Sequence, residues 1–441
     1  MHRLFPSFYK LALGYGMAAT CLSDLLGEYL GEYSASQPHP IETIIEVWHR
    51  NMGTALGITV LLIGLTIGLI WLAVEWQYRR RPGNKLEVTA GTWEIQTADP
   101  AHYRLRGQLA LINRTQRLEI MVPELSVETT LLSKGSLAGI QQHIQVIPQH
   151  EDAPSRPDGY WFAYIVKRKP SHVAVVLDLQ GSDLSQLQSV WLRVNYVTYG
   201  PGGRLAQTRH IVLPLKFPTV TASKNWRSTP QSKILPIHTH LLSQIDDPVE
   251  IVQRYVSPHA QPGDVITIGE TPVALMQGRF RHPSEIRPGW VARRICYFFM
   301  PTSSLATACG MQSLVDIVGA GRVVSAFMLG AVAKKFLGKP GLFYQLAGEQ
   351  ARLIDDVTGT LPPYDQFIVL GPENPQQVVD RIYQETGLGA AIVDVNDLKA
   401  VKILAASAGV SLSLLEQALI SNPAGNADEQ TPLVLIRPMV G

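Results

Sequence analysis

The chain has 441 residues, of which 46% are hydrophobic and 17% charged, and its formal net charge is +2. This length exceeds what one hydrophobic core usually covers, so we expect two or three domains. A mean hydropathy of only +0.07 excludes a transporter with many spans, the charge balance argues against nucleic acid as a partner, and three widely separated cysteines argue against a disulfide framework.

Residues 1–51 form an N-terminal segment, and the sequence is compatible with several arrangements of this segment relative to a membrane. Residues 11–22 are apolar and follow Lys10, as in the apolar core of a signal peptide, but no small-residue cleavage site follows. An interfacial helix or a short re-entrant segment is favoured, and a second span that forms a hairpin with the next segment is an alternative.

Residues 52–78 predict a transmembrane helix. Residues 52–74 are apolar or small and carry no charge, and about 20 such residues cross the hydrocarbon core of a bilayer as a helix. Trp48 precedes this run, and Trp71 and Trp76 lie at its other end, as interfacial aromatic residues do. Arg79, Arg80 and Arg81 follow directly, so the basic excess predicts a single-pass membrane protein whose C-terminal domains lie in the cytoplasm. A buried core helix is the alternative.

Residues 86–217 predict an antiparallel β-sandwich. Strand-like runs occupy residues 103–112, 161–166, 173–179, 191–199 and 204–215. The turn 200–203, Gly-Pro-Gly-Gly, is typical of a hairpin because glycine accepts positive φ. This stretch holds no cluster of His, Cys or carboxylate residues, so a spacer or a surface for a protein partner is favoured over catalysis. Residues 218–233 are polar and lack periodicity, which predicts a linker.

Residues 234–441 predict a mixed α/β (α+β) domain. Apolar residues recur at helical spacing over 249–256, behind Asp246 and Asp247. A strand is expected at 265–269, and residues 390–393 read as a buried strand that ends in Asp394.

The end of that last strand carries candidate metal ligands. With period-2 alternation Asp394 and Asn396 share one face, and Asp397 begins the turn. Such oxygen ligands suit Mg²⁺ or Mn²⁺, which in turn can hold a phosphate. The alternative is that Asp394 merely ends a strand and that Asp397 caps a helix beginning near Leu398.

Several stretches of the C-terminal region occur in the order of one known family. They are residues 261–264 (QPGD), 270–279 (ETPVALMQGR), 338–344 (GKPGLFY), 353–356 (LIDD), 370–375 (LGPENP), 390–394 (AAIVD) and 426–432 (NADEQTP). Together they resemble the coenzyme F420-0:L-glutamate ligase (gamma-glutamyl ligase) family over residues 234–438.

The resemblance implies a mixed α/β fold, often dimeric, that uses GTP and a divalent metal to join glutamate to a carboxylate of the deazaflavin precursor. The carboxylate would be activated as an acyl phosphate, which the glutamate amine then displaces. Two metal-binding aspartates of the family fall on Asp355 and Asp394, with Asn396 or Asp397 in support. An anionic cofactor would be met by Gln277, Gly278 and Arg279, and the guanidinium of Arg279 would contact phosphate.

The chain also departs from the family's pattern. A Ser-Lys-x-Glu-Gly stretch of the family corresponds to residues 274–278, Ala-Leu-Met-Gln-Gly. An apolar Leu275 cannot neutralise a phosphate as a lysine does. After Asp394, residues 395–399 (VNDLK) replace the expected Thr and Gly-Arg-Pro.

Two functions therefore stand against each other. The first is a membrane-anchored ligase-like protein that binds Mg²⁺ or Mn²⁺ and GTP or another nucleotide and forms an amide bond. The second is a catalytically degenerate ligase fold that serves as a membrane-bound scaffold. The expected partners are the membrane, a protein bound through the β domain and a second copy in a homodimer.

Other candidate residues have ordinary structural alternatives. His238 and His240 could share a strand face as ligands, but buried or surface histidines are commoner. Basic residues at 279, 281, 287, 293 and 294 could line an anion pocket or form a solvated face. Lys334, Lys335 and Lys339 lie near glycines but match no phosphate-loop pattern.

Overall fold

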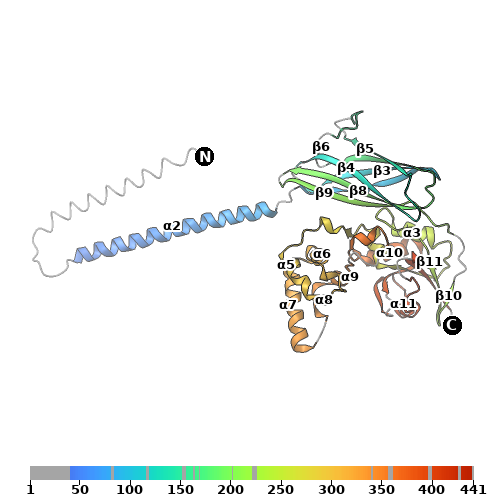
Figure 1. Cartoon of the computed structure of the whole chain (residues 1–441). Coiled ribbons are helices and arrows are strands. Elements are labelled where there is room, and N and C mark those ends of the chain that lie inside the picture. The colour runs from blue at the N-terminus through green and yellow to red at the C-terminus, as the bar shows by residue number, and fades with distance from the viewer. Residues whose placement is uncertain are drawn as a thin grey trace, which may run out of the picture. The chain divides into compact units, whose positions relative to one another are not determined.

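The computed structural model describes residues 40–80, 84–115, 119–150, 155–161, 164–167, 169–200, 202–220, 226–338, 341–355, 361–395, 400–425 and 429–439 (Figure 1). The chain divides into two units, residues 1–81 and 82–441, and each is described by itself. The interpretations offered for residues 1–37 lie outside the described residues.

The first unit contains one long helix, α2 (Pro40–Arg80), of 41 residues. The predicted apolar helix is confirmed, but it begins at Pro40 and not near Met52. Within it, Asn51–Gln77 is long and apolar enough to cross a membrane, and its side chains are not buried inside the protein. By length and composition this helix could be a membrane anchor or a signal sequence.

The second unit begins with the predicted β-sandwich, whose strands all pair antiparallel. One sheet has the order β1-β3-β7-β5 with β2 also on β3, and the other has the order β6-β4-β8-β9. Apolar residues of both sheets, such as Leu109, Leu177 and Leu192, fill the core between them. The strands are β1 (Leu86–Val88), β2 (Thr92–Asp99), β3 (His102–Asn113), β4 (Ile120–Ser133), β5 (Gln141–Gln149), β6 (Tyr164–Val166), β7 (Ser171–Gln180), β8 (Leu187–Gly200) and β9 (Gly203–Pro214).

The expected glycine turn joins β8 to β9, where Gly200 pairs with Gly203. Asn84, at the start of this unit, is buried and contacts the turn. Its side-chain Nδ2 donates to the carbonyl oxygen of Gly203 (2.6 Å), and its Oδ1 accepts from the backbone N–H of Gly202 (3.2 Å). The entry of the chain into the sandwich is therefore held against this hairpin.

A six-stranded sheet organises the C-terminal region, in the order β10-β11-β17-β12-β15-β16. β12 and β15 are parallel, whereas the other neighbours are antiparallel. The strands are β10 (Arg227–Ser228), β11 (Ser232–Ile237), β12 (Val265–Gly269), β15 (Gly389–Val395), β16 (Val401–Ala406) and β17 (Leu433–Pro438).

Helices cover both faces of this sheet because the central strands are apolar on both sides. Ile266 and Ile392 point to the face covered by α3 (Pro248–Tyr255) and α10 (Pro375–Thr386). Their neighbours Val265 and Val393 point to the face covered by α11 (Leu412–Leu419). The predicted helix at 249–256 and strand at 265–269 are confirmed, and the side chain of Asp247 caps α3.

A group of helices lies between β12 and β15 in sequence and has an apolar core of its own. Figure 1 shows α5, α6, α7 and α8 gathered together. The group comprises α4 (Glu270–Met276), α5 (Trp290–Ile295), α6 (Ala308–Val318), α7 (Ala320–Leu337), α8 (Leu342–Ala347) and α9 (Gln350–Leu353), with the short strands β13 (Phe280–Arg281) and β14 (Ile368–Val369).

Two sequence expectations about local structure are wrong. Part of the predicted linker is sheet, because residues 227–228 form β10 and pair with β11. The alternative of a helix beginning near Leu398 does not extend into residues 401–406, which form β16 and pair with β15 as the next strand of the sheet; residues 396–399 lie outside the described residues. In both places pairing with a strand of an existing sheet overrides local propensity.

An aromatic and aliphatic cluster joins the sandwich to the C-terminal region. Trp191 and Val212 project from β8 and β9 and pack against Ala274 and Leu275 of α4 and against Phe367. The rings of Trp191 and Phe367 lie 5.3 Å apart. The indole N–H of Trp191 donates to Nδ1 of the buried His210 (3.0 Å).

We expect the junction to contribute strongly to stability. Trp191→Ala should lower the free energy of unfolding by about 3–5 kcal/mol, because it leaves a cavity, and Trp191→Phe by about 1–3 kcal/mol, because His210 loses its donor. Urea unfolding of the detergent-solubilised full chain, followed by circular dichroism, measures both. Trp290→Ala is the control, since Trp290 is 72% exposed. An equal effect of Trp191→Ala and Trp290→Ala would contradict the assignment.

Candidate functional site

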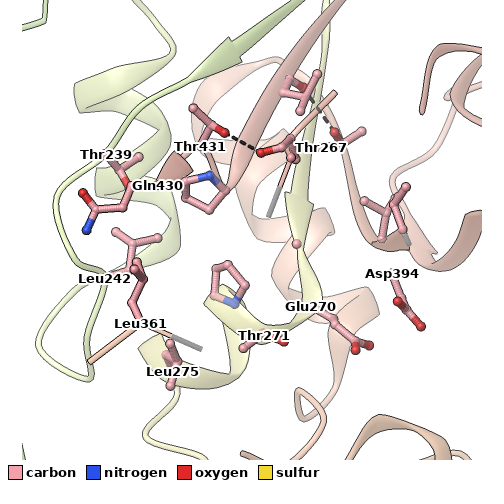
Figure 2. Close-up of a pocket in the computed structure, with 18 of the residues that line it drawn as sticks. Thr239, Leu242, Thr267, Glu270, Thr271, Leu275, Leu361, Asp394, Gln430 and Thr431 are labelled. Atoms are coloured by element: carbon pink, nitrogen blue, oxygen red, sulfur yellow. Dashed lines mark hydrogen bonds between the residues drawn. The ribbon is translucent and has the colours of Figure 1, made fainter. Parts of the chain in front are cut away.

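A cavity of about 480 Å³ opens at the carboxyl ends of β12 and β15 (Figure 2). Its walls come from β12, the first turns of α4, the end of β15 and the loops before α3 and β17. Ligands in α/β proteins commonly bind outside the carboxyl ends of parallel strands, and this volume is within the usual range for a small-molecule site.

The register of β12 and β15 brings two carboxyl groups side by side. Gly269 and Val393 are partners in the parallel ladder. The residues that follow them are Glu270, which begins α4, and Asp394. Both side chains line the cavity, and Figure 2 shows them next to each other. The adjacency follows from strand pairing and not from proximity in sequence.

A third carboxyl group, that of Asp355, reaches the same cavity from the far side of the helical insertion. Its backbone N–H donates to the carbonyl oxygen of Val369 (2.9 Å), and the N–H of Val369 donates back (2.8 Å). This bridge extends β14 and fixes Asp355 near the first turn of α4. The structure thus brings together Asp355 and Asp394, which are distant in sequence.

The neighbouring acidic side chains disfavour the ionisation of Glu270 and of Asp355. Burial raises the pKa of Glu270, and the charges of Asp394 and Asp355 add to that effect, giving a pKa of about 9 although Lys402 acts in the opposite direction. Burial and then Asp394 raise the pKa of Asp355 to about 6, while a hydrogen bond with Thr271 lowers it. The site is therefore able to hold protons at neutral pH or to exchange them for a cation.

These carboxyl groups fit a hard divalent cation in their chemistry. Oxygen donors are the ligands that Mg²⁺ and Mn²⁺ prefer, and Oε2 of Glu270 is buried without a hydrogen-bond partner. Among the residues that the structure describes, however, no group of three or more His, Cys, Asp or Glu side chains is placed so that it could hold a metal ion by itself. A cation bound here would need further oxygen ligands from water or from a substrate.

The other end of the cavity is uncharged. Thr239, Leu242 and Gln430 lie there, away from Glu270 and Asp394 (Figure 2). Leu275 and Leu361 form an apolar wall in between. No Lys or Arg occurs among the described residues that line the cavity. The cavity therefore has an acidic end and a neutral end with hydroxyl and amide groups.

The candidate anion-binding residues lie outside this lining. Gln277 and the backbone of Glu373 exchange two hydrogen bonds (2.8 and 2.7 Å). The guanidinium of Arg279 donates to the carbonyl oxygen of Gly371 (2.6 Å) and pairs with the carboxylate of Glu373 (3.0 Å). Gly278 adopts a φ of +67° between them. In this structure the three residues hold the loop before α10.

The remaining candidates divide into three cases. Asn396 and Asp397 lie outside the described residues. His240 lines the cavity, but its ring is engaged by the hydroxyl of Tyr255 (2.7 Å) and the carboxylate of Asp246 (2.9 Å), so it is a buried structural histidine. Arg281 is paired with Asp316 (2.6 Å).

Sequence reasoning missed the role of Glu270. The available signal was its place directly after the strand 265–269, the same place that Asp394 has after the strand 390–393. Two buried strands that each end in a carboxylate predict an acidic site only if the strands are neighbours and parallel, which sequence alone does not establish.

Comparison with known structures shows only local likeness. The GAE domain of GGA2p from Saccharomyces cerevisiae covers 30% of this chain and 91% of its own length, with 12% identity and a TM-score of 0.19. The N-terminal domain of PorA covers 30% and 96%, with 11% identity and a TM-score of 0.18. The yeast GGA1 GAE domain covers 29% and 91%, with 12% identity and a TM-score of 0.18. The comparison with curated proteins found no match.

The comparison with protein families found one match, and it falls on the sandwich. Residues 87–217 match the family model described as F420-0:gamma-glutamyl ligase, N-terminal Ig-like domain. The resemblance expected from the sequence lies in the C-terminal region alone, whereas this match lies in the β domain. Through its Ig-like domain the chain is related to the F420-0:gamma-glutamyl ligase family.

Proposed function

We propose that the C-terminal region binds a divalent cation at the acidic end of the cavity, where Glu270, Asp355 and Asp394 would act together with oxygen atoms of water or substrate, and that it holds an anionic substrate with this cation and forms an amide bond through an activated carboxylate. The observation that carries the proposal is that three carboxyl groups from three separate segments meet in one cavity, where Oε2 of Glu270 has no hydrogen-bond partner. The match of residues 87–217 to the Ig-like domain of a ligase family supports the reaction class.

The chain's own residues suggest how the cavity would be used. A divalent cation would supply screening between the carboxylates and the oxygens of a phosphate, which otherwise repel each other. Leu275 is apolar and the described lining has no Lys or Arg, so no basic side chain of the described lining would supply this screening. The uncharged end, with Thr239 and Gln430, would take the polar, neutral part of the substrate, such as the base of GTP or of another nucleotide.

The anchoring of the protein is part of the same proposal. Helix α2 would span a membrane once, and the basic residues Arg79, Arg80 and Arg81 directly after its apolar stretch would keep the sandwich and the C-terminal region in the cytoplasm. GTP and glutamate would then be available to the cavity.

A scaffold without catalysis remains the second candidate, and a specific observation favours it. The position that corresponds to the family's lysine is Leu275, whose side chain packs partly against the sandwich. A domain that has replaced a cation by a packing residue can serve as a rigid platform for a partner of the β domain or for a second copy.

Divalent-cation binding tests the proposal directly. Titration of the detergent-solubilised full chain with Mn²⁺, followed by electron paramagnetic resonance, should give at least about tenfold weaker affinity for Asp394→Asn and Glu270→Gln, because each removes one charged ligand; this is about 1.4 kcal/mol. Glu416→Gln is the control, since it removes an exposed carboxylate of α11. Equal Mn²⁺ affinity in all variants, or none in the parent, would refute the cation site.

Turnover separates the two candidate functions. With Mn²⁺ present, a ligase should consume GTP in the presence of glutamate and an acceptor carboxylate, and Asp394→Asn should abolish this consumption. A chain that consumes no nucleotide but is recovered from solubilised membranes with a stoichiometric partner would be a scaffold.

The raised pKa values predict an unusual pH dependence of stability. The pKa of Glu270 is raised to about 9 in the folded protein. The protonated side chain therefore makes its full contribution to the free energy of unfolding at pH values below the pKa that Glu270 has in the unfolded chain. This contribution is lost as the pH rises toward 9. In EDTA the Tm of the parent should therefore fall between pH 6 and pH 9, Glu270→Gln should reduce this fall, and Mn²⁺ should oppose it. Calorimetry at several pH values measures this, with Glu416→Gln as control. A Tm profile of Glu270→Gln that parallels the parent's would contradict the assignment.

A further inference from the structure

The helical insertion presents a large apolar and aromatic surface that nothing in the described chain covers. We call it the α5–α7 surface. It is formed by α5 with the 3₁₀ turn that follows it (Cys296–Phe298), and by the outer face of α7. Its principal side chains are 59–83% exposed: Trp290, Tyr297, Phe298, Met300, Met328 and Phe336. Contiguous exposed apolar side chains on a protein surface commonly mark interaction sites.

The two parts of the surface are contiguous. Phe298 of the 3₁₀ turn and Phe327 of α7 have ring centroids 5.0 Å apart. The exposed aromatic residues of the first part therefore meet α7 at the half-buried Phe327, next in sequence to the exposed Met328.

Helix α7 is apolar on its outer face as well as on its inner one. Val323, Ala326 and Ala333 are buried against the insertion, and Gly330 lies so close to α8 that a Cβ there would be 3.1 Å from the backbone nitrogen of Phe343. On the opposite side Met328 and Phe336 are exposed. A helix that is hydrophobic all round is suited to a protein core or to lipid, and α7 is not in a core.

The sequence of this insertion carries an excess of positive charge. Residues 285–349 contain seven basic residues and three acidic ones, Glu285, Asp316 and Glu349, and Asp316 is paired with Arg281. The basic residues include Arg293 and Arg294 at the end of α5 and Lys334 and Lys335 at the end of α7. Exposed aromatic and aliphatic side chains beside Lys and Arg are the composition of segments that lie in the interface of an anionic bilayer.

We propose that the α5–α7 surface inserts into the interfacial layer of an anionic lipid membrane. The aromatic side chains would occupy the headgroup region, where Trp and Tyr are favoured, and the lysines and arginines would contact lipid phosphates. A second copy of the chain is a poorer occupant, because two such surfaces facing each other would oppose their positive charges. The apolar helix α2, on the same chain, would raise the local concentration of this surface at a bilayer. This proposal is independent of whether the cavity is catalytic.

Photo-cross-linking of the full chain in nanodiscs tests the surface. p-Benzoylphenylalanine placed at Phe336 should form lipid adducts, detected by mass spectrometry, and the yield should rise severalfold when phosphatidylglycerol is added to phosphatidylcholine. The same probe at Tyr383 is the matched control, since Tyr383 is an aromatic residue of α10 that is 44% exposed and outside the surface. The double variant Lys334→Glu/Lys335→Glu should remove the dependence on phosphatidylglycerol, and because both lysines are exposed it should keep the fold.

The contrary results are distinct. A yield of lipid adduct at Phe336 no greater than at Tyr383 would overturn the proposal. Adducts at Phe336 with a second copy of the chain, or with another protein when membranes from cells are used, would replace the lipid surface with a protein interface and would equally overturn it.

Discussion

The parallel pairing of β12 with β15 is the constraint on which the candidate site depends. The pairing aligns Gly269 with Val393, and so places the next residues, Glu270 and Asp394, at the mouth of one cavity. Buried carboxyl groups in contact with one another are unfavourable unless protons or a cation offset their charge. Here these groups lie at the carboxyl ends of the central parallel strands. Ionisable side chains with strongly shifted pKa values commonly occur at functional sites.

Helix α4 couples this edge to the Ig-like domain. Its first residue, Glu270, faces the cavity, and one turn later Ala274 and Leu275 pack against Trp191 and Val212 of the sandwich. The sandwich therefore buttresses the helix that positions a carboxyl group of the site, because a short helix of seven residues has little stability of its own. Through this contact the β domain stabilises part of the C-terminal region, in addition to the role of spacer or partner-binding surface that its sequence predicts. The contact also explains why an apolar residue at 275 is useful to this chain.

The helical insertion between β12 and β15 contributes to the cavity on its inner side and forms an exposed surface on its outer side. Its inner side supplies Asp355 to the cavity through the bridge with Val369, and its outer side carries the aromatic residues and the positive charge described above. The outer surface arises because the insertion has more apolar residues than its small core can bury. Together with α2, this is the part of the molecule whose composition departs most from that of an ordinary soluble domain.

The sequence by itself determined the periodic elements: the apolar helix within α2, the alternating strands of the sandwich with their glycine turn, helix α3 and the buried strands β12 and β15. These follow from local patterns of burial and turn chemistry. It also singled out Asp394, from its place at the end of a buried strand, and Asp355, through a resemblance. Tertiary structure alone decided that Glu270 joins them, that residues 401–406 form a strand beside β15, and that Arg279 pairs with Glu373 outside the cavity lining. Which strands become neighbours, and in which register, depends on contacts between distant segments, and no local pattern encodes that choice.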